Sequence, residues 1–503
     1  MGKTKKVLLN TCATMLQMIV AQIISLFVSK KVLEVYGSDL NGVNAILSNV
    51  MDWILLLEGG LTLASNVALF RPYISKDYEQ CNRILAATKR QFEKIGLLIL
   101  GAGVILAIVY PYFIKTGIPQ WDIFLMFTIM SMSTSFGVAY TRKYALLFNV
   151  SQNEYINTLI TTIVTILGNI VVYIVALNKV NYLVIRVVYL LTTVLTGIVV
   201  SIVVRKKYSF VNYKVTPDYV AIEGTKDVVY QKITTLLRSS APLIFISVIV
   251  SSTFASIYSV YVFIYGFVQK LVMMVINATQ SGIGQLIAEK KRNEVYKVYR
   301  IFEFASTVAM LWLMSVAIPM TMPFVRFYTH NVTDVNYVDW WLLFFIAGNI
   351  MIQVLHIPSG IIINMSGAFK QAKNYQIISC GVMIISILVL SKFWNIYGVL
   401  AGIMISSIIL ALLEIRYTRK VFFEEKYIDL VKPVISIMAI MFPICIFEIC
   451  SMPYEFSIPS FCVCGVILAV INIICILGIM YIFERERLKE LIRRIISTVH
   501  RRK

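Results

Sequence analysis

The stretch "YVFIYGFVQKLVMMVINATQ", Tyr261 to Gln280, holds a single charged residue, Lys270, inside a long run of apolar side chains. About 20 apolar residues are enough for a helix to cross the hydrocarbon core of a bilayer. An ammonium group in such a helix loses its hydration, which is costly unless it faces a cavity or a partner. The stretch therefore predicts a membrane span with a charge near its centre.

The same pattern recurs along the 503 residues, of which 59% are hydrophobic and 14% charged, as in membrane proteins. Ten runs contain no Lys, Arg, Asp or Glu: residues 7–29, 95–114, 123–141, 155–178, 271–288, 304–325, 341–369, 374–391, 393–413 and 456–483. Four further spans carry one or two charges: residues 42–70, 182–204, 233–250 and 434–449. We expect an all-α polytopic membrane protein with fourteen transmembrane helices.

One break in this pattern needs a turn, because a single span cannot extend from residue 233 to residue 288. The small, polar stretch "SSTFAS", Ser251 to Ser256, is the natural place for it. The eighth span then begins near Ile257, ahead of Lys270.

The distribution of positive charge gives the orientation. With fourteen spans, 37 of the 46 Lys and Arg residues fall on the side that holds both termini, 6 on the other side and 3 within spans. Positive residues favour the cytoplasmic side, so both ends are expected to be cytoplasmic. The formal net charge of +20 follows from these short loops, and no basic domain is left to bind nucleic acid.

Cysteine and histidine suggest no catalytic or metal site. The three histidines are far apart and lack metal-ligand spacing. The eight cysteines lie mostly in apolar runs, where a small hydrophobic residue is the default, although Cys450 could pair with Cys462 or Cys464. We expect a protein that is not an enzyme and has no cofactor beyond a possible coupling ion, H⁺ or Na⁺.

Two halves of the chain resemble each other, as in many transporters. Arg83 aligns with Arg300 at an offset of 217, and "NVS" at 149–151 aligns with "NMS" at 364–366 at an offset of 215. Tyr182 and Tyr397 repeat the offset of 215. The expected organisation is a six-helix lobe (1–208), a cytoplasmic linker (209–227), a second six-helix lobe (228–420), two further helices (421–483) and an amphipathic basic tail (484–503).

Charges at membrane depth are the candidate site residues, because such residues usually face a cavity. We expect a cationic cavity formed by Lys270, Arg238, Arg142 and Lys143, with acidic Asp52 and Glu58 and the further candidates Asn44, Gln269 and Arg186. Lys270 and Asp52 could form an ion pair between the lobes. Snorkelling to the headgroups is favoured for Arg186 and stays open for Arg142 and Lys143. Net positive charge suits phosphate or pyrophosphate.

Aromatic residues near these charges have two interpretations. Tyr140, Tyr261, Tyr265 and Trp53 could stack on sugar rings, but packing is the more frequent role of aromatic residues at helical spacing. The basic tail is interpreted as a helix on the anionic inner leaflet, with binding of a partner synthase as the alternative.

Several stretches carry a family resemblance. These are "NGVNAILSNVMDWILLLEGGLTLASNVALFRPYISKDYEQCNRIL", "ALLFNVSQNEYINTL", "INMSGAFKQAKNY", "FVRFYTHNVTDVNYVDWW" and "NIYGVLAGIMISS". Together they resemble Wzx-type polysaccharide flippases of the multidrug, oligosaccharidyl-lipid and polysaccharide exporter (MOP) superfamily, which includes the MATE exporters. The resemblance extends from Asn10 to about Phe483, and its motifs are diffuse.

The resemblance implies a two-lobed transporter of the bacterial inner membrane. Its cargo would be an undecaprenyl-pyrophosphate-linked oligosaccharide, the repeat unit of O-antigen of lipopolysaccharide, of capsule or of a similar glycan. A polysaccharide polymerase and a chain-length regulator would be partners. From the family only the cationic cavity is carried over, onto Arg142, Arg238 and Lys270. A lipid II flippase, a multidrug exporter and, from another class, a membrane glycan polymerase remain as alternatives.

Overall fold

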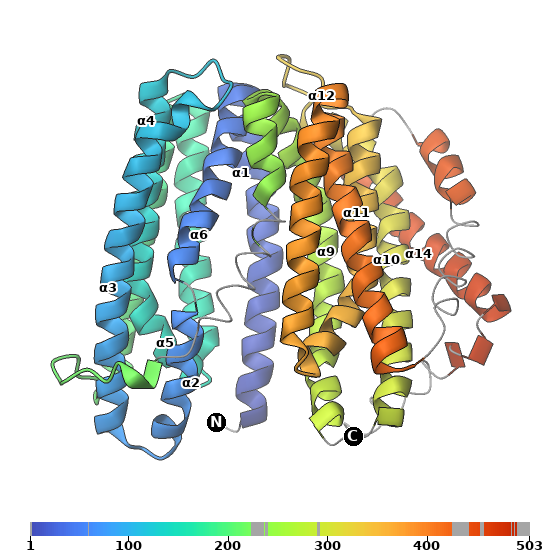
Figure 1. Cartoon of the computed structure of the whole chain (residues 1–503). Helices are drawn as coiled ribbons and strands as arrows, with labels where there is room; N and C mark the ends of the chain where they lie inside the picture. Colours follow the sequence, from blue (N-terminus) through green and yellow to red (C-terminus); the bar gives the residue numbers. More distant parts are fainter. Residues whose placement is uncertain are drawn as a thin grey trace. The chain divides into compact units, whose positions relative to one another are not determined.

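The computed structural model describes residues 3–58, 60–222, 236, 240–288, 292–424, 442–452, 457–483, 485–486 and 488–489. All regular elements within these ranges are helices, which confirms the expected fold class. The chain forms two compact units, Met1–Ser256 and Ile257–Lys503. The course of the chain through the elements of each unit can be followed by colour in Figure 1.

The first unit contains eleven described elements in chain order. They are α1 (Lys3–Ile54), the 3₁₀ turn η1 (Leu55–Glu58), α2 (Leu61–Ile74), α3 (Tyr78–Val109), the 3₁₀ turn η2 (Tyr110–Tyr112), α4 (Gln120–Phe136), the π-helix η3 (Gly137–Thr141), α5 (Arg142–Val150), α6 (Glu154–Leu177), α7 (Tyr182–Lys207) and the 3₁₀ turn η4 (Val220–Ile222). A short helix, Ser240–Ile249, precedes the end of the unit.

The second unit contains most of α9 (Ser252–Ala288), then α10 (Arg292–Tyr328), α11 (Trp340–Met365), α12 (Phe369–Arg416), the π-helix η5 (Tyr417–Phe422) and α14 (Ile458–Phe483). A short apolar helix, Phe442–Ser451, lies before α14. In this unit α10 packs against α11 and α14, and α11 packs against α12.

The described helices follow the chain order of the fourteen expected spans. Ten are long and apolar enough to cross a membrane within the described residues. One of them, α12, contains two expected spans and is kinked at Trp394 and Asn395. The helix α1, kinked at Gly37 (φ 81°), contains the first expected span and the start of the second, which continues through η1 into α2. The seventh and thirteenth expected spans correspond to the two short helices, and most of residues 434–449 lies outside the described part.

The expected turn between the seventh and eighth spans is present. The helix before it ends at Ile249 and α9 begins at Ser252, five residues earlier than expected. The backbone N–H of Ser252 donates to the carbonyl of Lys115 (3.0 Å), and its hydroxyl bonds the Asp39 carboxylate. These contacts hold the turn in the first unit, which extends to Ser256.

Glycines allow helices of the first unit to pack closely. A Cβ on Gly103 of α3 would lie 2.1 Å from the Ser131 hydroxyl of α4, and one on Gly96 would lie 2.6 Å from Cβ of Ala139. The other face of α3 is apolar and open, with Leu97 70% and Ile105 63% exposed. Small residues inward and large apolar ones outward are the pattern of a lipid-facing helix.

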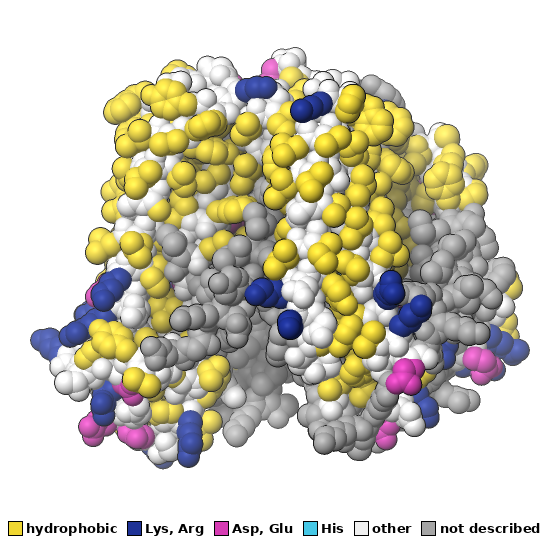
Figure 2. All heavy atoms as spheres, viewed as in Figure 1, with side chains coloured by type: hydrophobic (Ala, Val, Ile, Leu, Met, Phe, Trp, Pro, Cys, Tyr) yellow, Lys and Arg dark blue, Asp and Glu magenta, His cyan; other side chains and the backbone are white. Residues whose placement is uncertain are grey.

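Charge is segregated along the first unit. On the face shown in Figure 2, Lys, Arg, Asp and Glu gather around the connection between α2 and α3, and hydrophobic side chains cover most of the helices beyond it. Near the start of both helices, the backbone N–H of Tyr155 on α6 donates to the Asn10 side chain of α1 (2.8 Å). Further along both, the Tyr36 hydroxyl of α1 donates to the carbonyl of Val180, just after α6 (2.6 Å). The two helices are therefore parallel, as the first and fifth spans must be.

The repeat appears in the backbone. The C-cap of α5 is Ser151, and Gln152 after it has a left-handed φ of 57°. The C-cap of α11 is Ser366, and Gly367 after it has a φ of 78°. The N–H of Asn153 then bonds the carbonyl of Phe148 (2.8 Å), as Ala368 does with Ile363 (3.1 Å). These are the same helix cap at an offset of 215.

The linker after α7 lies along the N-terminal part of α3. Asn82 donates to the carbonyl of Phe210 (2.9 Å), and the N–H of Asp218 bonds the carbonyl of Arg83 (3.1 Å). Hydrogen bonds from the Gln80 amide and from the backbone hold the pKa of the Asp218 carboxyl below its ordinary value. Residues 223–227 of the expected linker lie outside the described part.

Candidate functional site

Glu58 and Arg142, two of the expected cavity residues, meet in the first unit. Glu58 closes η1 between α1 and α2, is only 9% exposed and accepts a hydrogen bond from the Thr62 hydroxyl. Its other oxygen, Oε2, lies 3.7 Å from Nη2 of Arg142. The Arg142 side chain is 45% exposed, so this contact leaves much of the guanidinium free to bind a ligand.

A local irregularity of the helix precedes Arg142. The fourth span does not end at Thr141, as the charge-free run suggested, but continues through a π-helical turn, Gly137–Thr141, into α5. π-turns are uncommon and frequently occur at functional sites. The turn places Arg142 within a continuous helical segment and not in a loop.

Arg142 lines a pocket of about 430 Å³ inside the first unit. The walls come from Leu55 of η1, from α4 with its π-turn and α5, and from α6 and α7. Eight of the fourteen lining residues are Ser or Thr, and Asn157 adds an amide. This polar wall is unusual for helices whose outer faces are apolar.

Lys143, the neighbour of Arg142, has different surroundings. Its ammonium lies 3.4 Å from Oε1 of Glu93 on α3 and 5.0 Å and 5.4 Å from the ring centres of Tyr140 and Tyr144. The residue is 5% exposed and is not one of the residues that line the pocket. The two consecutive cations thus have separate sets of contacts.

Arg186 is buried and does not extend to the surface of its unit, unlike the snorkelling side chain expected. It is 6% exposed and its guanidinium carbon lies 5.5 Å from the Tyr182 ring centre. Its Nε and Nη2 have no hydrogen-bond partner among the described residues. The ring of Tyr182 supplies a cation–π contact at this position.

On α1, Asp52 and Asn44 also lie at the level of the expected cavity. Asp52 is exposed and forms no ion pair with the described residues. Asn44 is half-buried, and its Oδ1 has no hydrogen-bond partner there. Both side chains therefore have unused hydrogen-bonding capacity.

In the second unit, Lys270 and Gln269 of α9 differ in their contacts. The Gln269 amide donates to Oε1 of Gln353 (3.1 Å). Lys270 is exposed, and no ion pair or hydrogen bond joins it to the part of the chain that the structure describes. The expected pair between Lys270 and Asp52 would join the two units and stays a prediction. Arg238 lies outside the described residues.

Three of the aromatic residues considered for sugar stacking have packing roles. Tyr261 and Tyr265 are fully buried, and their hydroxyls bond the carbonyl of Tyr337 (2.8 Å) and the hydroxyl of Thr321 (3.0 Å). Tyr140 is stacked on Phe136 with ring centres 5.0 Å apart. The packing interpretation is favoured for these three.

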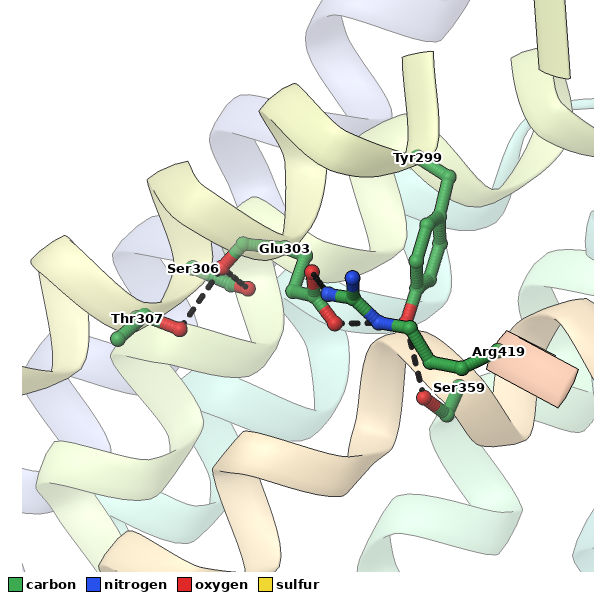
Figure 3. A network of polar contacts seen from close by, with 6 residues as sticks. All are labelled: Tyr299, Glu303, Ser306, Thr307, Ser359 and Arg419. Carbon is green, nitrogen blue, oxygen red and sulfur yellow. Dashed lines mark hydrogen bonds and ion pairs between the residues drawn. The ribbon is translucent and has the colours of Figure 1, made fainter. Parts of the chain in front are cut away.

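Sequence analysis missed a buried cluster of ionisable residues in the second unit, shown in Figure 3. Arg419 of η5 forms an ion pair with Glu303 of α10, and both are less than 5% exposed. The Tyr299 hydroxyl donates to Oε1 of Glu303 (2.7 Å) and lies 2.9 Å from the Ser359 hydroxyl. The cluster ties α10, α11 and η5 together.

A second buried pair lies on neighbouring positions of α11 and α12. Nδ1 of His356 is 2.7 Å from Oε2 of Glu414, with exposures of 7% and 5%. Gly360 leaves room for this carboxylate, since an added Cβ would lie 2.9 Å from it. Nε2 of His356 has no hydrogen-bond partner in the described ranges.

No group of three or more potential metal ligands occurs among the described residues. All eight cysteines are free, including Cys450, Cys462 and Cys464. The first unit thus holds a half-exposed arginine in a hydroxyl-lined pocket, and the second unit holds an exposed lysine and two buried charge pairs.

Comparison with solved structures identifies the class of fold. A lipid II flippase, MurJ, in an inward closed conformation is similar with a TM-score of 0.69 and 14% identity, over 96% of this chain and 100% of that one. An inward-facing MATE multidrug resistance transporter of the MOP superfamily gives 0.54 and 12%, over 78% and 92%. The chain therefore has the fold of MOP superfamily transporters.

A third similar structure is a MOP superfamily transporter from Pyrococcus furiosus, described as having a binding pocket of reversed polarity. Its TM-score is 0.53 at 13% identity, over 82% of this chain and 94% of that one. No family model matches the sequence, and no curated protein matches it. Similarity at 12–14% sequence identity shows that the fold is shared and does not identify the cargo.

Proposed function

We propose that the chain is a Wzx-type flippase that moves an undecaprenyl-pyrophosphate-linked oligosaccharide, the repeat unit of O-antigen, capsule or a similar glycan, across the bacterial inner membrane. The fold supports this proposal, because it is shared with a lipid flippase and with multidrug transporters. The resemblance of the sequence stretches to Wzx-type flippases supports it independently of the fold.

The observation that carries the proposal is the exposed ammonium of Lys270 on α9, which forms no ion pair within the part of the chain that the structure describes. A charge at membrane depth is costly unless it faces water or a partner of opposite charge. Within the described residues its own unit offers no such partner, whereas a pyrophosphate does. Arg142 adds a second cation with a planar set of donors suited to phosphate oxygens.

Transport would follow from differential binding. A ligand shifts a conformational equilibrium only by its difference in affinity for the two states. Alternating access by movement of one lobe against the other is the usual mechanism of such two-lobed transporters.

An ion gradient could drive the cycle through Asp52. This carboxylate is exposed on α1 and forms no ion pair in the described part of the chain. Membrane carboxylates of this kind bind protons or sodium ions. A polysaccharide polymerase and a chain-length regulator would use the exported lipid.

Two rival cargoes come from the same fold. Lipid II is also a polyprenyl pyrophosphate, and the likeness to MurJ supports it as the second candidate. A multidrug exporter of organic cations fits less well, because Lys270 and Arg142 would repel such substrates. A membrane glycan polymerase fits least, because the fold is shared with a flippase and with transporters.

The test is to delete the gene and measure lipid-linked oligosaccharide in each membrane leaflet, by its access to an impermeant enzyme in intact cells. We expect the intermediate to accumulate in the cytoplasmic leaflet, while polymerase activity in broken membranes is unchanged. Accumulation of lipid II would support the second candidate. Normal export of both lipids in the deletion strain would refute the flippase proposal.

A further inference from the structure

The hydroxyl groups of the first unit's pocket suggest which part of the cargo it binds. Arg142 is the one charged residue among the fourteen lining residues that the structure describes. Attraction for phosphate accounts for the arginine but not for the eight hydroxyl side chains around it.

Three threonines of α7 have already used their protons. The hydroxyls of Thr192, Thr193 and Thr196 donate to main-chain carbonyls one turn earlier, at 2.7 Å, 3.0 Å and 2.8 Å. A hydroxyl has one proton and two lone pairs, so an oxygen bonded in this way can still accept. The Thr193 oxygen also lies 2.9 Å from the Ser133 hydroxyl, so Thr192 and Thr196 are the two threonines here whose oxygens offer acceptors to a ligand.

Two more lining atoms have no partner. Oγ1 of Thr141, in the π-turn, and Oδ1 of Asn157, on α6, are both buried and make no hydrogen bond with the described residues. Buried polar atoms are nearly always bonded, so each is available to a ligand. An amide oxygen can only accept, which adds to the acceptor character of the wall.

A wall rich in acceptors is complementary to a ligand rich in O–H donors. Every free hydroxyl of a sugar carries a proton, whereas an ionised phosphate can only accept. A bound metal cation is disfavoured, because the Arg142 guanidinium lies in the same pocket. The volume of about 430 Å³ is within the usual range of small-molecule sites.

We propose that this pocket is a saccharide subsite, which holds the sugar adjacent to the pyrophosphate while Arg142 contacts the phosphate itself. This inference rests on the proposed function and deepens it by assigning recognition of the glycan to the first unit. A polyprenyl pyrophosphate without sugar would then lose the hydrogen bonds to the pocket's threonines and keep the contact of its phosphate with Arg142.

The first experiment measures saccharide binding without transport. Purified full-length protein in lipid nanodiscs is mixed with methyl glycosides of glucose, galactose and N-acetylglucosamine, and separately with inorganic pyrophosphate, and binding is followed by saturation-transfer NMR. We expect Thr196→Val to weaken glycoside binding about fivefold, the loss of one neutral hydrogen bond, and Asn157→Ala at least as much. Neither change should affect pyrophosphate, whereas Arg142→Gln should weaken it.

Thr162→Val is the matched control. Thr162 is on α6, donates to the carbonyl one turn earlier (2.7 Å) as Thr196 does, and does not line the pocket. Its replacement should leave glycoside binding unchanged. The inference is overturned if the wild type binds none of the glycosides, if the Thr162 and Thr196 variants behave alike, or if the Thr196 change weakens pyrophosphate equally.

The gene deletion separates this inference from the proposed function. If the deletion strain exports lipid-linked oligosaccharide normally, yet glycosides bind in a Thr196-dependent way, the flippase proposal fails and the saccharide site stands. If the intermediate accumulates but no glycoside binds, the flippase proposal stands and the saccharide subsite fails.

Discussion

The two units hold their membrane charges in different ways. In the first, Arg142 is half-exposed at a pocket and its contact with Glu58 is 3.7 Å long. In the second, Arg419 and Glu303 are buried together and bonded to neighbouring side chains. The difference shows that charge at membrane depth is not enough to identify a binding site. A cation that a carboxylate already neutralises serves packing, and one left partly free is available to cargo.

The largest expected effect comes from breaking the buried pair. Glu303→Leu would leave Arg419 without its carboxylate, and removing one partner of a buried ion pair costs about 3–5 kcal/mol of unfolding free energy. Thermal unfolding in detergent measures this loss. The double variant Glu303→Leu with Arg419→Leu should recover most of it. Equal instability of the single and double variants would contradict the structural role.

A smaller loss of stability is expected from the histidine pair. His356→Leu removes the hydrogen bond to Glu414 and leaves a buried carboxylate with one partner fewer, which costs about 1–3 kcal/mol. Gly360→Ala should destabilise the same site by crowding, since its Cβ would lie 2.9 Å from Oε2 of Glu414. Unfolding measurements on both variants test the site, and wild-type stability in both would exclude a structural contribution of this pair.

Consecutive residues of α5 sharpen the comparison. Arg142→Gln should lower transport at least tenfold, by loss of a charged hydrogen bond of about 1.5–3 kcal/mol, yet change stability by no more than about 1 kcal/mol. Lys143→Met should keep transport, because Lys143 does not line the pocket and its stem packs beside Tyr140 and Tyr144. Export assays at matched protein levels test both, and the opposite ranking would move the site from Arg142 to Lys143.

The smallest expected effect is a gain in affinity for pyrophosphate and not a loss of function or stability. Glu58→Gln keeps a side chain that can bond Thr62 but removes the negative charge 3.7 Å from Arg142. A partly exposed ion pair contributes about 0.2–1 kcal/mol, so affinity for inorganic pyrophosphate should rise by a factor of about 1.4 to 5. Isothermal titration on purified protein measures it. Weaker pyrophosphate binding would show that Glu58 positions Arg142 and does not compete with the anion.

Much of the fold could be predicted from the sequence. Apolar runs located the helices, and small residues located the turn before α9. The offset of 215 anticipated the matching caps at Ser151 and Ser366. These features depend on local composition and backbone preference, which a single sequence contains.

The buried charges could not be predicted from runs of uncharged residues. A span defined by the absence of charge must end at the first charge, so Glu303, Glu414 and Arg419 were placed at or beyond span ends. In the structure α10 begins at Arg292, eleven residues before Glu303, and the helix after Glu414 continues to Phe422. Only tertiary packing brings opposite charges together and allows the helices to extend past them.

The pocket was predicted only in part. Arg142 and Glu58 were candidates because they are charged, and the structure brings them together. The threonines of α7 gave no signal, because hydroxyl side chains that bond their own helix are common in membrane spans. Their role depends on α4, α6 and α7 meeting around one space, which is a property of the fold.

The central claim is that an exposed cation binds an anionic cargo, and substitution of Lys270 tests it most directly. The measurement is the amount of lipid-linked oligosaccharide in the cytoplasmic leaflet of cells that carry wild type, the deletion, Lys270→Gln or Lys270→Arg, with membrane protein levels checked by blot. We predict that Lys270→Gln accumulates the intermediate as the deletion does, while Lys270→Arg retains substantial export. Normal export by Lys270→Gln at a normal protein level would contradict the claim.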